Sequence, residues 1–405
     1  MKINIMKWID RYPGQLVCLL LNLVYFCSNL FMGRRKVTNP KRILVMKFFG
    51  MGSIVLASPF FKRIKERFPG AKICFLTFSS NAEICKRLEV ADRYFFLRTN
   101  NFFVFTWDFI QNLIKLRRLK LDLVFDLEFF ARFSTSVAYL SGATLRVGYY
   151  MNLIWRGNLL THQVHYNSHK HISEVFMALL NSLGREYEVG PVSSPKITHE
   201  EKKELRNVLR RFAISPARVR VLLNVNASSL SLERRWPAEN YIILLEKLAK
   251  KFPDTDFILI GSPAEKEYTD SIFKDEGLFN FNNVYNLAGE FSIGGLLALI
   301  QSSLLLITND SGPLHLAASL NLPTLSIFGP ESPLRYAPPG DGHTIFYKGI
   351  YCSPCLNVYN AKTAQCQGNN RCMREIKVED VYPSACLKIK VLQNKITIQD
   401  DFRVV

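Results

Sequence analysis

The sequence is short of negative charge. Its 405 residues include 34 Asp and Glu against 52 Lys and Arg, which gives a formal net charge of +18 at pH 7. An excess of this size implies an anionic partner, such as nucleic acid, a phosphorylated lipid or the cytoplasmic membrane surface. The chain also lacks zinc-finger spacing and the aromatic pattern of nucleic-acid recognition motifs. We therefore expect no nucleic-acid partner and favour a membrane surface.

No small-residue cleavage site follows the N-terminal apolar run Gly14–Gly33, so a secretory signal peptide is not expected. The run is about twenty residues long, which suffices to span a bilayer. However, polar residues such as Gln15, Asn22 and Asn29 interrupt it, and both flanks are basic. We favour an interfacial helix in segment 1–41 over a membrane span or a helix packed on the protein. The heavier downstream charge predicts that the body lies on the cytoplasmic face of the inner membrane.

A dinucleotide-binding fingerprint is incomplete. Gly50-x-Gly52 lacks the third glycine and a suitably spaced acidic ligand for a ribose. A nicotinamide-dependent oxidoreductase is therefore the least favoured enzyme class.

Four of the nine cysteines form a C-x2-C-x10-C-x5-C cluster: Cys352, Cys355, Cys366 and Cys372. Four thiolates at this spacing are compatible with a structural metal site. The alternatives are reduced cysteines in a compact loop or a pair of disulfides, and a cytoplasmic location argues against disulfides. Four histidines between residues 162 and 171 also have metal-ligand spacing, but we favour a basic loop there.

Apolar strands alternate with amphipathic helices from residue 43 onward, which predicts doubly wound α/β domains. The expected strands are Ile43–Phe49, Ile73–Phe78, Arg93–Leu97, Leu121–Leu127, Val221–Val225, Phe257–Ile260, Val284–Leu287, Leu304–Thr308 and Thr324–Phe328. We predict one domain over 42–200 and a second over 201–375, with Lys202–Arg220 as the linker and a terminal helix in 376–405. Their polar strand ends are candidates to face one another across a cleft.

The most informative stretch is residues 309–330. The strand Leu304–Thr308 runs into Asn-Asp-Ser-Gly, and a helix and another strand follow. In parallel sheets ligands bind at this strand end, where the N–H groups of the helix start attract an anion such as a pyrophosphate. We expect Asp310 to orient the turn or a neighbouring cation, and His315 to lie one helical turn beyond Ser311. The alternative is an ordinary connection with a helix-capping Asp or Ser.

Four segments, in this order and spacing, make the sequence similar to a known family. They are Gly50-Met51-Gly52-Ser53, Arg234-Arg235-Trp236-Pro237, Gly261-Ser262-Pro263-Ala264-Glu265, and Asn309 to His315 continuing through Phe328-Gly329-Pro330. The sequence resembles glycosyltransferase family nine, the bacterial heptosyltransferases of lipopolysaccharide core assembly. The resemblance covers roughly residues 42–380.

The resemblance implies two Rossmann-like domains facing across a cleft, the GT-B architecture. It also implies inverting, metal-independent transfer, with no cofactor required, from a nucleotide-sugar donor such as ADP-heptose. The implied acceptor is an anionic, lipid-linked glycolipid of the lipopolysaccharide type at the inner-membrane surface.

The resemblance also assigns a donor-binding set in the second domain. By position, the pyrophosphate and sugar would contact Asp310, Ser311, Gly312 and His315, the phosphate loop would be Ser228, Ser229 and Arg234, and Glu265 would lie near the ribose. Backbone N–H donors and a guanidinium would stabilise the charge on a leaving diphosphate without a metal.

One position departs from the family pattern. Many members carry Asp after the second glycine of the first turn, where it can act as general base, whereas this chain has Ser53. A serine hydroxyl is a poor base at neutral pH. Asp126 and Glu128, at the end of the strand Leu121–Leu127, are the best substitutes, although a capping or salt-bridge role fits each slightly better. A catalytically silent protein that binds nucleotide sugars or glycolipids is therefore the second hypothesis.

Overall fold

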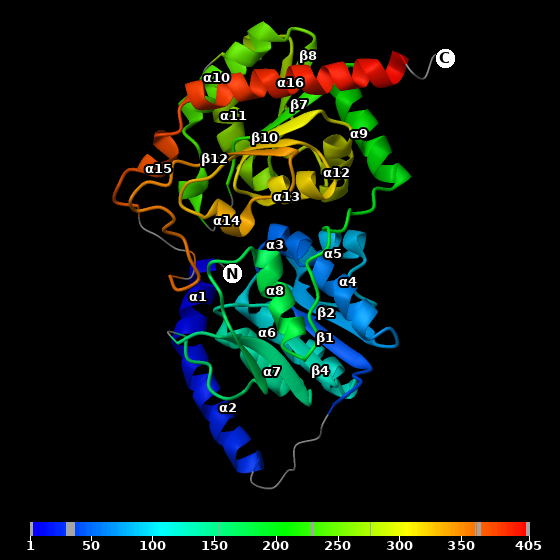
Figure 1. Cartoon of the computed structure of the whole chain (residues 1–405), viewed down its shortest axis with the longest axis vertical. Coiled ribbons are helices and arrows are strands. Elements are labelled where there is room, and N and C mark those ends of the chain that lie inside the picture. The colour runs from blue at the N-terminus through cyan, green and yellow to red at the C-terminus, as the bar shows by residue number, and fades with distance from the viewer. Residues whose placement is uncertain are drawn as a thin grey trace. The chain divides into compact units, whose positions relative to one another are not determined.

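The computed structural model describes residues 3–29, 37–152, 154–227, 231–275, 277–360, 362 and 366–401. The chain divides into two compact units (Figure 1). Unit 1 comprises residues 1–193 with 358–361, and unit 2 comprises 194–357 with 362–405. The division thus falls at Ser193, ahead of the predicted linker, and most of the predicted linker forms helix α9 (His199–Arg211).

Unit 1 is built on a six-stranded parallel sheet in the order β3-β2-β1-β4-β5-β6. Its strands are β1 (Arg42–Met46), β2 (Lys72–Phe78), β3 (Arg93–Leu97), β4 (Leu123–Asp126), β5 (Leu145–Tyr150) and β6 (His162–His165). The connecting helices are α3 (Met51–Leu56), α4 (Ser58–Arg67), α5 (Ala82–Leu88), α6 (Phe102–Arg118), α7 (Arg132–Leu140) and α8 (Ile172–Asn181). The inner strands read as continuous apolar runs because helices cover both faces of a parallel sheet.

Two N-terminal helices, α1 (Ile3–Arg11) and α2 (Pro13–Asn29), pack against α7. The carboxylate of Asp10 accepts hydrogen bonds from the backbone N–H groups of Arg132 (3.0 Å) and Phe133 (2.7 Å). Asp10 therefore satisfies two donors that the start of a helix leaves unpaired. None of the helices in the described part of the chain combines the length and apolar character that a bilayer span requires.

Unit 2 repeats the design with a parallel sheet in the order β12-β11-β10-β7-β8-β9. Its strands are β7 (Val219–Asn224), β8 (Thr255–Leu259), β9 (Val284–Asn286), β10 (Leu305–Asn309), β11 (Thr324–Ile327) and β12 (His343–Phe346). Its α-helices besides α9 are α10 (Ala238–Lys251), α11 (Lys266–Asp275), α12 (Ile293–Gln301), α13 (Gly312–Ser319), α14 (Pro333–Tyr336), α15 (Arg371–Arg374) and α16 (Val378–Asp401). The predicted terminal helix is confirmed: α16 packs along α10 and buries Val381, Ala385 and Ile389.

Both sheets share one strand order, with the first strand of each unit beside its fourth. This is the doubly wound Rossmann order, so the prediction of two Rossmann-like α/β domains is confirmed. The order reverses between β1 and β4 in unit 1 and between β7 and β10 in unit 2. Ligands of such sheets bind beyond the carboxyl ends of the strands at these reversals, so a site is expected at each of them.

Candidate functional site

At the reversal in unit 2, the buried side chain of Asn309 binds three groups that lie 68 to 83 residues before it in the sequence. Its Nδ2 donates to the carbonyl oxygen of Asn226 at 3.1 Å. Its Oδ1 accepts from the backbone N–H of Trp236 and from the hydroxyl of Tyr241, both at 3.0 Å. Asn309 therefore fixes the Arg-Arg-Trp-Pro turn against the end of β10.

A second asparagine, Asn224 at the end of β7, shapes the start of α13. Its Nδ2 donates to Ser311 Oγ at 2.8 Å and to Thr308 Oγ1 at 3.1 Å. The Ser311 side chain is thus held inward, at the N-cap position of α13. The first N–H groups of a helix have no intrahelical partner, and together with the helix dipole they attract an anion.

Arg234 is paired with Asp310 directly before α13. Arg234 Nη1 lies 3.3 Å from Asp310 Oδ2, and the two side chains are 15% and 5% exposed. The cation that we expected Asp310 to orient is therefore Arg234. The next residue, Arg235, lies over the ring of Tyr268, 3.9 Å from its centroid. The two arginines of this turn thus have different partners.

The remaining residues of the predicted donor set have different surroundings. His315 lies on α13 one turn after Ser311 and is 5% exposed. The Glu265 carboxylate accepts from both the backbone N–H and the hydroxyl of Ser262, each at 2.8 Å, and so caps a short helix. Ser228 and Ser229 lie outside the described residues.

At the reversal in unit 1, a buried ion pair joins the ends of β1 and β4. Lys47 Nζ lies 2.8 Å from Glu128 Oε1, with the side chains 3% and 1% exposed. The same Oε1 accepts from the backbone N–H groups of Phe48 (2.6 Å) and Phe49 (3.0 Å). Glu128 Oε2 has no hydrogen-bond partner among the described residues.

Asp126 is fully buried, and both of its carboxylate oxygens bind protein groups. Oδ1 accepts from the N–H of Glu128 (3.1 Å), and Oδ2 accepts from the hydroxyls of Ser134 (2.8 Å) and Thr135 (3.1 Å). Arg156 Nη1 lies 3.8 Å from Oδ2. Burial raises the pKa of Asp126 to about 6, although Arg156 opposes this shift. The structural role that we considered for Asp126 therefore fits its surroundings.

Ser53 lies in the first turn of α3 and is half-buried. The residue before this helix, Gly50, has φ of 85°, a left-handed conformation that glycine adopts without strain. The sequence places this helix too late: it predicts a turn over residues 50–53, whereas Met51–Ser53 form the first turn of α3 and only Gly50 lies outside it.

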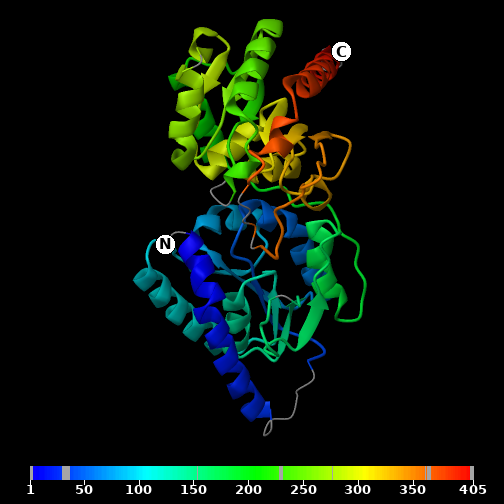
Figure 2. The ribbon, with the colours of Figure 1, turned by 90° about the vertical axis from the view of Figure 1, so that its left-hand side faces the viewer.

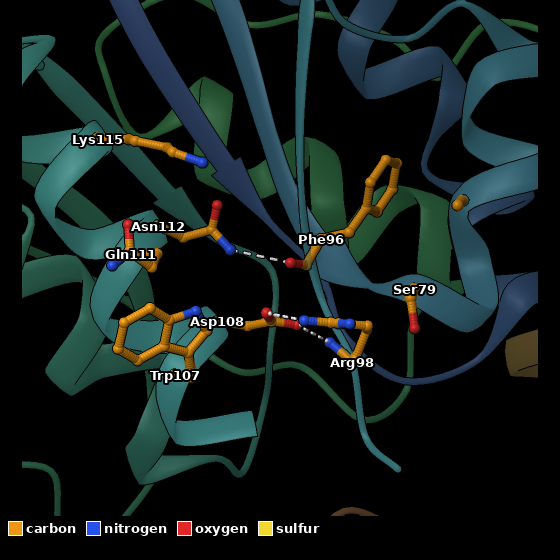
Figure 3. Close-up of a pocket in the computed structure, with 9 residues that line it drawn as sticks. Ser79, Phe96, Arg98, Trp107, Asp108, Gln111, Asn112 and Lys115 are labelled. Atoms are coloured by element: carbon orange, nitrogen blue, oxygen red, sulfur yellow. Dashed lines mark hydrogen bonds and ion pairs between the residues drawn. The ribbon is translucent and has the colours of Figure 1, made fainter. Parts of the chain in front are cut away.

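Unit 1 also contains a pocket of about 640 Å³ that the sequence analysis missed (Figure 3). It is lined by Ser79, Ala82, Phe96, Arg98, Trp107, Asp108, Gln111, Asn112 and Lys115. Arg98 Nη2 and Nε lie 2.8 and 2.9 Å from the two oxygens of Asp108, and this pairing lowers the pKa of Asp108. Ser79 and Arg98 directly follow β2 and β3, so the pocket opens at strand carboxyl ends.

Comparison with known proteins identifies the family. The profile of glycosyltransferase family 9 (heptosyltransferase) matches residues 113–364. This chain belongs to glycosyltransferase family 9. The resemblance found in the sequence is therefore confirmed, and with it membership of a family of glycosyltransferases.

Curated relatives are heptosyltransferases that match over part of their length. Lipooligosaccharide heptosyltransferase 2 of Campylobacter jejuni is 30% identical over 171 residues, which are 40% of this chain and 50% of that protein. Lipopolysaccharide heptosyltransferase 2 of Escherichia coli is 34% identical over 108 residues, 26% of this chain and 30% of that protein. The chain thus spans half or less of the length of these relatives.

Solved structures of the family share the fold over most of the chain. The structure of Escherichia coli ADP-heptose lipopolysaccharide heptosyltransferase II has a TM-score of 0.68 at 19% identity and covers 88% of this chain and 99% of its own. A glycosyltransferase family 9 structure from Veillonella parvula has a TM-score of 0.69 with the same identity and coverage. The predicted fold class is confirmed by these likenesses.

The four clustered cysteines, as they are arranged here, do not fit a metal. Within the described residues, no group of three or more His, Cys, Asp or Glu side chains has the arrangement of a metal site. Cys352, Cys366 and Cys372 carry free thiols. Burial raises the pKa of Cys372 to about 11. The structure thus supports the alternative that these cysteines are reduced and lie in a loop.

Sequence reasoning missed the residues that hold these family 9 segments together. Asn224, Asn309 and Lys47 form hydrogen bonds to other protein groups, and the sequence analysis gave none of the three a role. Each is a polar residue at the end of an apolar strand, and that position was the available signal. What the sequence does not give is the identity of their partners, because these lie up to 87 residues away.

Proposed function

We propose that this family 9 member transfers a sugar, heptose, from a nucleotide diphosphate donor to a lipid-linked acceptor of the lipopolysaccharide type. The observation that carries the proposal is the Arg234–Asp310 pair at the start of α13. A guanidinium held at a helix N-terminus, at the reversal of a doubly wound sheet, suits a diphosphate.

The donor site would work by stabilising the leaving group. The acceptor oxygen forms a bond to the anomeric carbon as the bond from that carbon to the diphosphate breaks, on the opposite face, so configuration inverts. Negative charge then grows on the diphosphate, and Arg234 and the N–H groups of α13 would stabilise it. No metal or other cofactor is needed for this role.

We place Ser311, Gly312 and His315 beside the diphosphate and sugar, Ser228 and Ser229 at the phosphates, and Glu265 near the ribose.

For the general base we favour Glu128 over Asp126 and Ser53. The acceptor hydroxyl must lose its proton as it attacks. Both oxygens of Asp126 accept hydrogen bonds from protein groups, whereas Glu128 Oε2 has no such partner among the described residues. Lys47 and the N–H groups of Phe48 and Phe49 hold the other oxygen of Glu128, which would fix its orientation. Ser53 would then orient the acceptor and would not take its proton.

We place the anionic groups of the acceptor in the unit 1 pocket. Lys115 supplies positive charge there beside the Arg98–Asp108 pair, and Trp107 supplies an aromatic face of the kind that packs on sugar rings. The N-terminal helices would hold the protein at the cytoplasmic face of the inner membrane, where such an acceptor is found.

The second candidate is a silent binding protein of the same fold. It is favoured by Ser53 and by the burial of both Asp126 and Glu128. The experiment is to incubate the purified full chain with ADP-heptose and a deep-core lipid acceptor. Formation of the extended glycolipid supports the transferase. Donor binding without transfer from any nucleotide sugar would leave the silent protein as the function.

A further inference from the structure

Unit 1 exposes large apolar side chains on three helices. On α1 and α2, Trp8 is 59% exposed and Phe26 is 67% exposed, with a row of leucines between them. On α6, Phe103 is 83%, Trp107 62% and Ile110 45% exposed. Contiguous apolar patches are rare on monomeric soluble proteins and mark interaction surfaces.

The three helices belong to one surface because they pack on the same part of α7. The rings of Phe105 and Phe109, on the inner side of α6, lie 5.5 Å from the ring of Phe133 on α7. The backbone N–H of the same Phe133 donates to Asp10 of α1 at 2.7 Å. Figure 2 shows α6 beside the α1–α2 pair, on the side of unit 1 that faces the viewer. We call the exposed side chains of α1, α2 and α6 the three-helix face.

The helices of the three-helix face carry more positive than negative charge. Residues 3–29 and 102–118 contain two acidic residues, Asp10 and Asp108. Asp10 is used by the N-terminus of α7, and Asp108 is paired with Arg98. The cations of the same two segments are Lys7, Arg11, Lys115, Arg117 and Arg118. The partner of this face should therefore be apolar at its centre and anionic at its edge.

We propose that α6 is a second membrane-binding element, and that the three-helix face docks as a whole on a bilayer with anionic headgroups. Tryptophan and phenylalanine side chains prefer the boundary between headgroups and acyl chains, and Lys and Arg beside them attract anionic lipids. Insertion at α6 as well as at the α1–α2 pair would fix the orientation of unit 1 on the bilayer more firmly than the pair alone. The proposal goes beyond the proposed function, because it requires no sugar transfer.

Docking through α6 would have a consequence for the pocket. Trp107 and Lys115 belong to α6 and also line the pocket. A membrane bound to the three-helix face would therefore bring the pocket close to the level of lipid headgroups. A lipid-linked acceptor would then reach it without leaving the bilayer.

The test is co-sedimentation of the full chain with vesicles of phosphatidylcholine alone or mixed with phosphatidylglycerol. The variant Phe103→Ser/Ile110→Ser changes α6 outside the pocket, and Leu20→Ser/Phe26→Ser changes α2. Leu387→Ser, which is 66% exposed on α16 of unit 2, is the matched control. We expect binding to require phosphatidylglycerol, to fall roughly tenfold in each double variant, and to be unchanged in the control.

Two results would overturn the proposal. One is binding of the α6 variant at the wild-type level while the α2 variant is released. The other is a wild-type dimer that the α6 variant converts to a monomer, because a second copy of the chain would then cover the face. Circular dichroism and ADP binding of each variant show that it is folded, so loss of vesicle binding is distinct from failure of the donor site.

Discussion

Arg234 and Asp310 meet across 3.3 Å at the start of α13, although 76 residues separate them in the sequence. The carboxylate holds the guanidinium where the N-terminus of α13 also favours an anion. Five consequences of this account and of the unit 1 sites can be measured, besides the test of the donor site itself.

Replacing Asp310 with Asn keeps the size of the side chain and removes its charge. Because Arg234 would lose its orienting partner, we expect kcat/KM for sugar transfer to fall roughly 100-fold. The melting temperature should change little, and Lys250→Gln on the exposed side of α10 is the control for loss of a surface charge. Near-normal transfer by Asp310→Asn would remove the pair from the donor site.

Replacing Asn309 with Ala should destabilise unit 2. The N–H of Trp236 and the hydroxyl of Tyr241 would each lose a buried acceptor. The Tyr241 hydroxyl keeps the carbonyl oxygen of Asn224 at 3.3 Å, so the N–H of Trp236 is the main loss. We expect the free energy of unfolding in urea to fall by about 1–3 kcal/mol, the cost of one unsatisfied buried polar group. An unchanged urea midpoint would show that Asn309 does not hold the turn.

Glu128→Gln should abolish transfer while ADP still binds. We expect kcat to fall by at least about 100-fold, the usual effect of losing a general base. Asp126→Asn is the matched comparison, because the surroundings of Asp126 fit a structural role. Its kcat should fall less, and its pH–rate profile should keep the wild-type shape. A larger fall in kcat for Asp126→Asn than for Glu128→Gln would make Asp126 the base.

Asp126 should also give stability a pH dependence. Burial raises its pKa to about 6 in the folded protein, above the usual value of 3.8. Between these values the folded state holds a proton that the unfolded state has lost, so this group's contribution to the free energy of unfolding falls as pH rises from about 4 to about 6. A shift of this size corresponds to roughly 3 kcal/mol. Urea unfolding of wild type and Asp126→Asn at pH 4 and pH 7 measures it, and identical pH dependence in both proteins would contradict the assignment.

The acceptor pocket predicts a change in KM. Lys115→Ala should raise the KM for an anionic acceptor several-fold, because a cation facing that acceptor is lost. The affinity for ADP should stay the same, because the donor site lies in the other unit. Lys62→Ala, an exposed position on α4 outside both the pocket and the three-helix face, is the control. Equal acceptor KM values for wild type and Lys115→Ala would place the acceptor elsewhere.

The sequence predicted the fold well where strands are apolar on both faces, as in β1, β4, β7 and β10. It missed β6 and β12, the edge strands, because each is four residues long and partly exposed, and each begins with His. The local order of residues also predicted the turn before α13 and a cation partner for Asp310. It could not predict the Lys47–Glu128 pair or the contacts of Asn309, since these depend on which strands become neighbours.

The central claim is that Arg234 and the start of α13 bind the diphosphate of the donor. Thermal unfolding of wild type and Arg234→Gln, each with and without ADP, tests it most directly. A ligand at 100 times its dissociation constant adds about 2.7 kcal/mol to the free energy of unfolding. The account predicts that saturating ADP raises the melting temperature of wild type and leaves that of Arg234→Gln almost unchanged. An equal rise in both proteins would contradict it.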